Sequence, residues 1–313
     1  MSVKKISIII PFFNEEENLK KLYSEIVPLY AMVPIFEVIF INDGSFDHGL
    51  EILKELQKQD EKIKIITFRR NYGQTAAMGA GIKHAGGDVI VSLDADLQND
   101  PADIPKLVSQ IDAGYDVVSG WRKERHDGWL RVFFSHIANK IIALVTKVKL
   151  NDYGCTLKAY QSDVVKKIDF YGGMHRLIPA YASWYGARVT EVVVNHRPRI
   201  HGQSKYGFSR IFKVIMDLLV AKFLIGYSSK PIYFFGFLGV LSFVVGFCAF
   251  IFAVILRFYG ISLIQTPLLL LTVMMFVLGI QLLSVGLLAD LVLRVSYHNE
   301  DRATYSIKEL IGF

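Results

Sequence analysis

The chain has 313 residues, 52% of them hydrophobic, and a formal net charge of +6. This length allows one large domain or two smaller ones, and the positive charge suits work on anionic lipids and phosphates, with no nucleic acid as partner. The only two cysteines are Cys155, in a segment of soluble composition, and Cys248, in an apolar one. This argues against a disulfide framework and a cysteine zinc site, and it favours a reducing compartment.

Short apolar runs alternate with amphipathic segments over the first 120 residues. Strands are predicted over 5–10, 36–41, 63–68, 89–93 and 116–119, and helices over 15–30, 50–57, 75–84 and 103–113. This alternation predicts a doubly wound, mostly parallel sheet. No secretory signal precedes the first strand, so we expect the N-terminus to stay in the cytoplasm.

The middle of the chain is less regular. A basic helix is predicted over 129–148 and a strand-rich run over 187–194. Residues 208–223 place apolar side chains opposite basic ones at helical spacing. Such a helix before a long apolar stretch is typical of a membrane interface, with an ordinary packed surface helix as the alternative.

Two long uncharged stretches follow. There is no charged residue across the 26 positions from Pro231 to Leu256, and none across the 32 positions from Phe258 to Ala289. Each exceeds the roughly 20 apolar residues that span a bilayer. We expect two transmembrane helices joined by a turn over 257–266; the alternative is a buried helical hairpin of a soluble protein. Lysine and arginine flank the pair on both outer sides, which predicts that both termini are cytoplasmic.

Polar residues cluster where the predicted parallel strands end. They are residues 11–15 after the first strand, 42–45 after the second, 71–74 after the third and 94–98 after the fourth. These carboxyl ends meet at one edge of the sheet, where ligands bind. Asp94 and Asp96 supply hard oxygen ligands for a divalent cation that would hold a diphosphate, although aspartates also favour turns and helix caps.

These four motifs in order, together with residues 152–160 and 202–206, resemble the inverting family-2 glycosyltransferases. Within that family the chain is most similar to the polyprenyl-phosphate branch, which includes dolichol-phosphate mannose synthase and bacterial undecaprenyl-phosphate sugar transferases. The resemblance covers essentially the whole chain. It implies an α/β, A-type glycosyltransferase fold (Rossmann-like, mostly parallel) followed by an interfacial helix and a transmembrane hairpin. The implied parts are a cytoplasmic catalytic domain (1–207), a juxtamembrane amphipathic helix (208–229), two transmembrane helices (230–293) and a cytoplasmic tail (294–313).

The resemblance also implies roles for individual residues. Donor nucleotide contacts are expected from Pro11, Phe12, Asn14, Glu15, Asp43, Gly73, Gln74 and Asp94. Mg²⁺ or Mn²⁺ would be held by Asp94, Asp96 and Gln98. The acceptor phosphate would meet Arg122, Arg131, Ser135, Arg199 and Lys205, and the catalytic set is Asp94, Asp96, Arg122 and Arg131. Three alternatives stay open: Glu15 as a helix N-terminal acid, Gly73 as an ordinary turn residue, and 196–205 as a basic collar for anionic lipid.

The implied reaction moves one sugar from a nucleotide-sugar, such as UDP-glucose, to a polyprenyl phosphate on the cytoplasmic leaflet of the inner (plasma) membrane, with inversion. A lipid phosphate is already an oxyanion, so it needs cations to hold it and no general base. The alternatives are a GDP-mannose donor, a hydroxyl acceptor, or a membrane-tethered nucleotide-binding regulator without catalysis. The chain lacks the Gln-x-x-Arg-Trp motif of chain-extending synthases. Expected partners are the donor, the lipid acceptor and the bilayer, with further copies of the chain left open.

Two parts of the sequence receive no role in the reaction. The tail over 297–313 departs from the ending of many bacterial family members, so no site is assigned there. His48, His84, His126 and His175 have no identifiable partner and are interpreted as structural or exposed.

Overall fold

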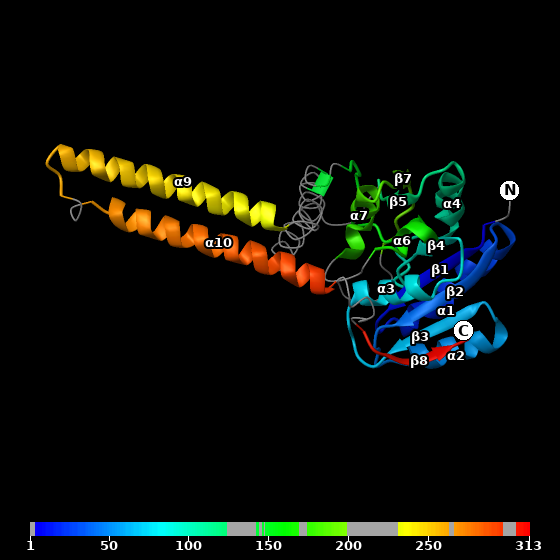
Figure 1. Cartoon of the computed structure of the whole chain (residues 1–313). Helices are drawn as coiled ribbons and strands as arrows, with labels where there is room; N and C mark the ends of the chain where they lie inside the picture. Colours follow the sequence, from blue (N-terminus) through cyan, green and yellow to red (C-terminus); the bar gives the residue numbers. More distant parts are fainter. Residues whose placement is uncertain are drawn as a thin grey trace. The chain divides into compact units, whose positions relative to one another are not determined.

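The computed structural model describes residues 4–123, 142–143, 146, 148–168, 174–198, 231–262, 266–296 and 305–313. The chain divides into two compact units (Figure 1). One unit contains residues 1–222 together with 303–313, and the other contains residues 223–302. Arg131, Ser135, Arg199, Lys205 and the predicted helix over 208–223 lie outside the described residues, as does most of the predicted helix over 129–148.

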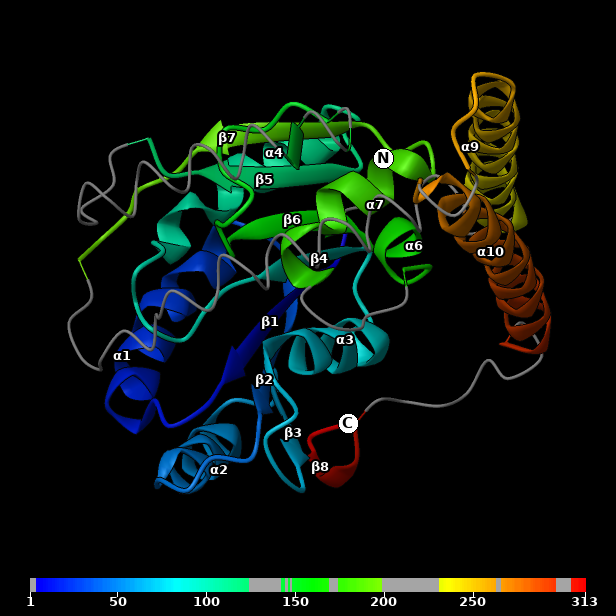
Figure 2. The same cartoon turned by 90° about the vertical axis from the view of Figure 1, so that its left-hand side faces the viewer.

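The first unit is built on an eight-stranded sheet with the strand order β7-β5-β6-β4-β1-β2-β3-β8 (Figure 2). The strands are β1 (Ile6–Phe12), β2 (Ile35–Asn42), β3 (Ile63–Phe68), β4 (Val89–Ser92), β5 (Val117–Trp121), β6 (Lys158–Gln161), β7 (Val189–Val193) and β8 (Ile307–Ile311). Neighbours among β1 to β4 run parallel, whereas β6 and β8 are antiparallel to their neighbours. The mixed, mostly parallel sheet confirms the predicted fold class.

Helices cover both faces of this sheet. They are α1 (Glu16–Ile26), α2 (Gly49–Gln59), α3 (Gln74–His84), α4 (Ile104–Asp112), α6 (Ser162–Val165) and α7 (Ile178–Trp184), with the 3₁₀ turns η1 (Val27–Ala31), η2 (Pro101–Asp103) and η3 (Met174–Arg176). Apolar side chains of α1, α2 and α4 share one buried cluster with alternate residues of β1. Helix α3 packs on the other face, where a Cβ on Gly81 would lie 2.9 Å from Ile41. Its small residues let this helix approach the strands closely.

Two strands escaped the sequence analysis. β6 has only four residues and begins inside the 152–160 motif, and β8 lies in the predicted cytoplasmic tail. β8 pairs antiparallel with the outer edge of β3. Lys54 Nζ meets a Glu309 carboxylate oxygen at 3.0 Å, and the Tyr305 and Phe68 rings stack with centroids 5.0 Å apart. The end of the chain is therefore an integral part of the first unit.

The second unit contains two long apolar helices, α9 (Pro231–Phe258) and α10 (Leu268–Ser296), which run side by side (Figure 1). Glycines allow close contact between them: a Cβ on Gly246 would lie 3.0 Å from Phe276, and one on Gly279 would lie 2.9 Å from Phe243. Only 28% and 11% of their most apolar windows are buried. A soluble hairpin core would be buried, so the length, composition and exposure favour two membrane spans.

Candidate active site

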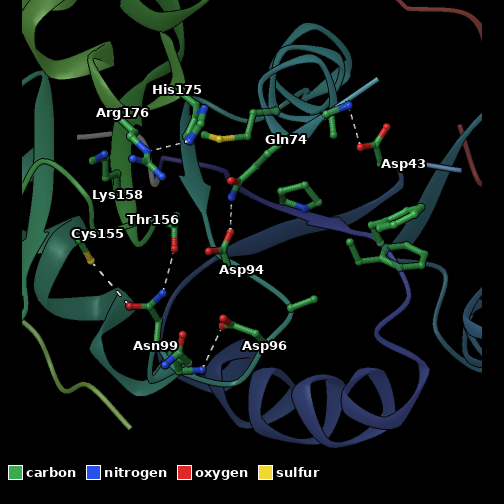
Figure 3. A pocket seen from close by; sticks show the side chains of 18 of the residues that line it. Asp43, Gln74, Asp94, Asp96, Asn99, Cys155, Thr156, Lys158, His175 and Arg176 are labelled. Carbon is green, nitrogen blue, oxygen red and sulfur yellow. Dashed lines mark hydrogen bonds between the residues drawn. The ribbon is translucent and has the colours of Figure 1, made fainter. Parts of the chain in front are cut away.

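A pocket of about 570 Å³ opens at the carboxyl ends of the central parallel strands (Figure 3). The chain runs from β1 to β2 and β3 on one side and then returns to β4 on the other, so strand order reverses between β1 and β4. This reversal is where open α/β sheets bind ligands. The predicted residues that line the pocket are Pro11, Phe12, Glu15, Asp43, Gly73, Gln74, Asp94, Asp96, Gln98 and Arg122. Asn14 does not line it; its side chain instead accepts a hydrogen bond from Phe46 N at 2.9 Å.

The Asp94 and Asp96 carboxyl groups form the acidic centre of the pocket. Asp94 follows β4 and accepts a hydrogen bond from Gln74 Nε2 at 2.7 Å, and Asp96 accepts one from the Gln98 backbone N–H at 3.2 Å. Leu97, between Asp96 and Gln98, has a left-handed φ of +59°, which turns the chain there. Burial, with the neighbouring Asp96 charge, raises the pKa of Asp94 to about 7.

The chemistry of this pair fits a hard divalent cation such as Mg²⁺ or Mn²⁺. Two repelling carboxylates in one pocket are stabilised by a positive charge between them. Within the described residues no group of three His, Cys, Asp or Glu side chains gathers around a common point. The remaining ligands would therefore be oxygens of a bound diphosphate and water, which is the usual arrangement for Mg²⁺.

Asp43 fixes the loop before α3. One carboxylate oxygen accepts from the Tyr72 backbone N–H at 2.7 Å, and the other accepts from the Gly73 N–H at 2.9 Å. Gly73 has a φ of +91°, a conformation that suits glycine, and it directly precedes Gln74 at the start of α3. Burial raises the pKa of Asp43, and the two backbone hydrogen bonds act in the opposite direction. The side chain thus presents an α-helix N-terminus, a favourable place for anions, to the pocket.

Arg122, the one predicted acceptor cation in the described part of the chain, is held in a forked ion pair. Its Nε and Nη2 donate to the two carboxylate oxygens of Asp152 at 2.7 and 3.0 Å. The Gly154 N–H donates to the same carboxylate at 3.0 Å. Asp152 opens the 152–160 motif, so this motif orients Arg122 at the pocket.

Several pocket residues were given no role in binding or catalysis by the sequence analysis. They are Asn99, Thr156, Lys158, His175 and Arg176. His175, for which the sequence offered no partner, has one in the structure: it lines the pocket, and its Nδ1 lies 2.7 Å from Thr75 Oγ1. Burial and nearby cations lower the pKa of His175 to about 3, so the ring is neutral. Lys158 could have been noticed because it lies in the 152–160 motif, whereas nothing local marks His175.

The sheet and the pocket define an α/β protein with an acidic site of ligand size between β1 and β4, where the strand order of the sheet reverses. Residues 7–169 match the family model described as "Glycosyl transferase family 2". The chain therefore belongs to this glycosyltransferase family.

Two curated relatives align over nearly the whole chain. The dodecaprenyl-phosphate galacturonate synthase of Rhizobium johnstonii is 37% identical over 98% of this chain and 93% of its own length. The undecaprenyl-phosphate 4-deoxy-4-formamido-L-arabinose transferase of Edwardsiella ictaluri is 33% identical over 99% of this chain and 95% of its own. Among solved structures, glucosyl-3-phosphoglycerate synthase from Mycobacterium tuberculosis in complex with Mn²⁺ and UDP-glucose has a TM-score of 0.57 and 17% identity, covering 72% of this chain and 82% of that one. This last similarity concerns the fold.

Proposed function

We propose that the protein transfers one sugar from a nucleotide-sugar, a UDP-sugar, to a polyprenyl phosphate in the membrane, with inversion. The observation that carries the proposal is the Asp94–Asp96 pair at the strand reversal, in a chain that also contains two membrane-length apolar helices. The names of both curated relatives support a polyprenyl-phosphate acceptor, and their alignments include these helices. The two names carry different sugars, neither of them glucose.

The donor is proposed to lie along the pocket from Asp43 toward Asp94. The nucleoside would contact the first strand end, with Pro11, Phe12 and Glu15, and the loop that Asp43 holds. The diphosphate would lie near the start of α3 and the carboxylate pair. Asp94, Asp96 and Gln98 would hold Mg²⁺ or Mn²⁺, which when bound neutralises charge on the departing diphosphate.

The acceptor supplies its own nucleophile. A phosphate oxygen of the lipid attacks the anomeric carbon, forming a new C–O bond as the C–O bond to the nucleoside diphosphate breaks. The attack from the opposite face inverts the configuration, and no proton has to be removed from the attacking oxygen. Arg122, oriented by Asp152, is proposed to steer the phosphate, together with Arg131, Ser135, Arg199 and Lys205.

The topology supports a hairpin with both flanks on one side of the membrane. β8 follows α10 in the chain, yet it pairs with β3 in the unit that precedes α9. The chain therefore returns after the second helix to the compartment of the catalytic sheet. The lysine and arginine residues on both flanks favour the cytoplasm, and we propose the inner membrane as the location, with residues 208–229 as an interfacial helix.

A donor screen tests this proposal. Purified protein in detergent would be incubated with undecaprenyl phosphate and either UDP-sugars or GDP-mannose, and both released nucleotide and lipid-linked sugar would be measured. We expect UDP release that depends on the lipid phosphate and yields one sugar per lipid. Nucleotide binding without lipid-linked sugar from any donor would favour a regulator, and transfer to a hydroxyl acceptor would favour the other alternative.

A further inference from the structure

The wall of the pocket beyond Asp94 carries a buried lysine. Lys158 is 2% exposed, and within the described residues its Nζ makes one hydrogen bond, to the Tyr153 carbonyl oxygen at 3.1 Å. An ammonium group has three donors, and burying its charge without a paired anion is costly. Among the described side chains no carboxylate lies within ion-pair distance of Lys158. The structure therefore holds a desolvated cation at the edge of a ligand-sized space.

The nearby groups do not neutralise this charge. Asp152 contributes to the electrostatic surroundings of Lys158, but both of its oxygens already accept from Arg122. Arg176 adds a second positive charge that acts on both Lys158 and His175. Arg176 Nε approaches His175 Nε2 at 3.4 Å, and the neutral imidazole carries no charge of its own. This wall of the pocket is therefore cationic.

The position of this cationic wall indicates which part of a bound donor would contact it. In Figure 3, Asp94 lies between Asp43 on one side and Lys158, His175 and Arg176 on the other. A nucleotide-sugar whose nucleoside lies toward Asp43 and whose diphosphate lies at Asp94 extends its sugar toward Lys158. Resting on the proposed function, we infer that the donor sugar is anionic, a uronic acid whose carboxylate binds Lys158 and Arg176.

The same charges are less suited to the lipid phosphate. Lys158 is almost fully buried, whereas the Arg122 side chain keeps 13% of its surface exposed. A phosphate that carries a polyprenyl chain has to enter from the open side of the pocket, where Arg122 can reach it. The sugar of a bound donor is already inside.

Donors that differ only at C6 test the inference. The pairs are UDP-glucuronate with UDP-glucose, and UDP-galacturonate with UDP-galactose, each compared by kcat/KM and by calorimetric binding. The wild-type protein should prefer the uronate of at least one pair by about tenfold or more, the effect of one charged hydrogen bond. Lys158→Met should remove this preference by weakening the uronate alone, and Lys158→Arg should retain part of it. Lys166→Met is the matched control, because Lys166 also donates to a carbonyl, Ala85 O at 2.6 Å, but lies outside the pocket lining.

The possible outcomes separate this inference from the proposed function. Transfer from neutral sugars with equal or better efficiency would leave the function standing and overturn the uronate site. A Lys158→Met protein that raises KM for the lipid alone would reassign the cation to the acceptor phosphate, which also overturns it. Tighter calorimetric binding of uronates without transfer from any donor would support the site and contradict the function. If Lys158→Met fails to fold, the wild-type donor pairs and Lys158→Arg decide the question.

Discussion

Asp43→Asn should weaken donor binding without removing the chemistry. Asp43 is 4% exposed, and its two oxygens accept from the Tyr72 and Gly73 N–H groups at 2.7 and 2.9 Å. An asparagine keeps one acceptor oxygen and turns an NH₂ group toward the other N–H. One hydrogen bond to a charged group is then lost, which costs about 1.5–3 kcal/mol, or roughly tenfold to a hundredfold in donor affinity if the loop must be ordered to bind.

The assay compares KM for the nucleotide-sugar with KM for polyprenyl phosphate, alongside thermal unfolding. Asp47→Asn is the control, because Asp47 also accepts from two backbone N–H groups, Glu16 at 2.9 Å and Gly49 at 3.2 Å, but does not line the pocket. We expect Asp43→Asn to raise the donor KM alone and Asp47→Asn to alter stability at most. Equal effects of the two variants on donor KM would refute the reasoning.

Three further predictions address the metal, the pH profile and the membrane topology. Asp96→Ala should abolish transfer while thermal unfolding stays near that of the wild type, and EDTA should inhibit the wild-type protein; activity that survives both treatments contradicts the metal assignment. Burial lowers the pKa of Lys158 to about 8; Cys155 and Asp152 oppose this shift, and Arg122 and Arg176 add to it. Burial raises the thiol pKa of Cys155 to about 11, so Lys158 loses its proton before Cys155 does. The pH dependence of kcat/KM reports the pKa values of the free enzyme. The kcat/KM for a uronate donor should therefore fall above about pH 8, whereas that for a neutral donor should not. Parallel pH profiles for the two donors would contradict the role of Lys158. In a variant without Cys248, a cysteine at Ser262 should react with an impermeant reagent from outside and one at Lys308 should not, and the reverse labelling would invert the proposed topology.

The fold was predictable where local sequence decides it. The strand over 63–68 was predicted with its observed bounds, and the other predicted strands shift by at most two residues at either end, because each is an apolar run with polar residues close to its ends. Pro11 does not end the first strand, which runs on to Phe12. β6 and β8 were missed because four and five residues of mixed polarity carry little periodic signal. Their stability comes from partners far away in the chain, β4 and β5 for β6 and β3 for β8.

In the site, too, local sequence predicted some residues, whereas the contacts between distant segments could not be predicted. Asp94, Asp96 and Asp43 were predicted because strand ends in a parallel sheet share an edge, and all three line one pocket. The partners of these residues were not predictable, since the two hydrogen bonds that Asp43 accepts from residues 72 and 73, and the forked ion pair between Arg122 and Asp152, join separate loops. The position of Lys158 depends on the pairing of β6 with β4 and β5, and that of His175 depends on the contact between η3 and α3. Their roles follow from the pocket and not from local patterns.

Because β8 follows α10 in the chain, the sheet of the first unit can be completed only after the second unit has been synthesised. A ribosome makes β8 only after both apolar helices, so a nascent chain has to carry an uncovered β3 edge until β8 emerges. Open strand edges template unwanted pairing, and the final strand ends that exposure. Tyr305 stacks on Phe68, which in turn meets Tyr72 edge-on at 5.7 Å, next to the Gly73 loop that Asp43 holds. The segment that carries Tyr305 and β8 therefore braces the loop before α3, and a chain without it would present an unfinished donor site.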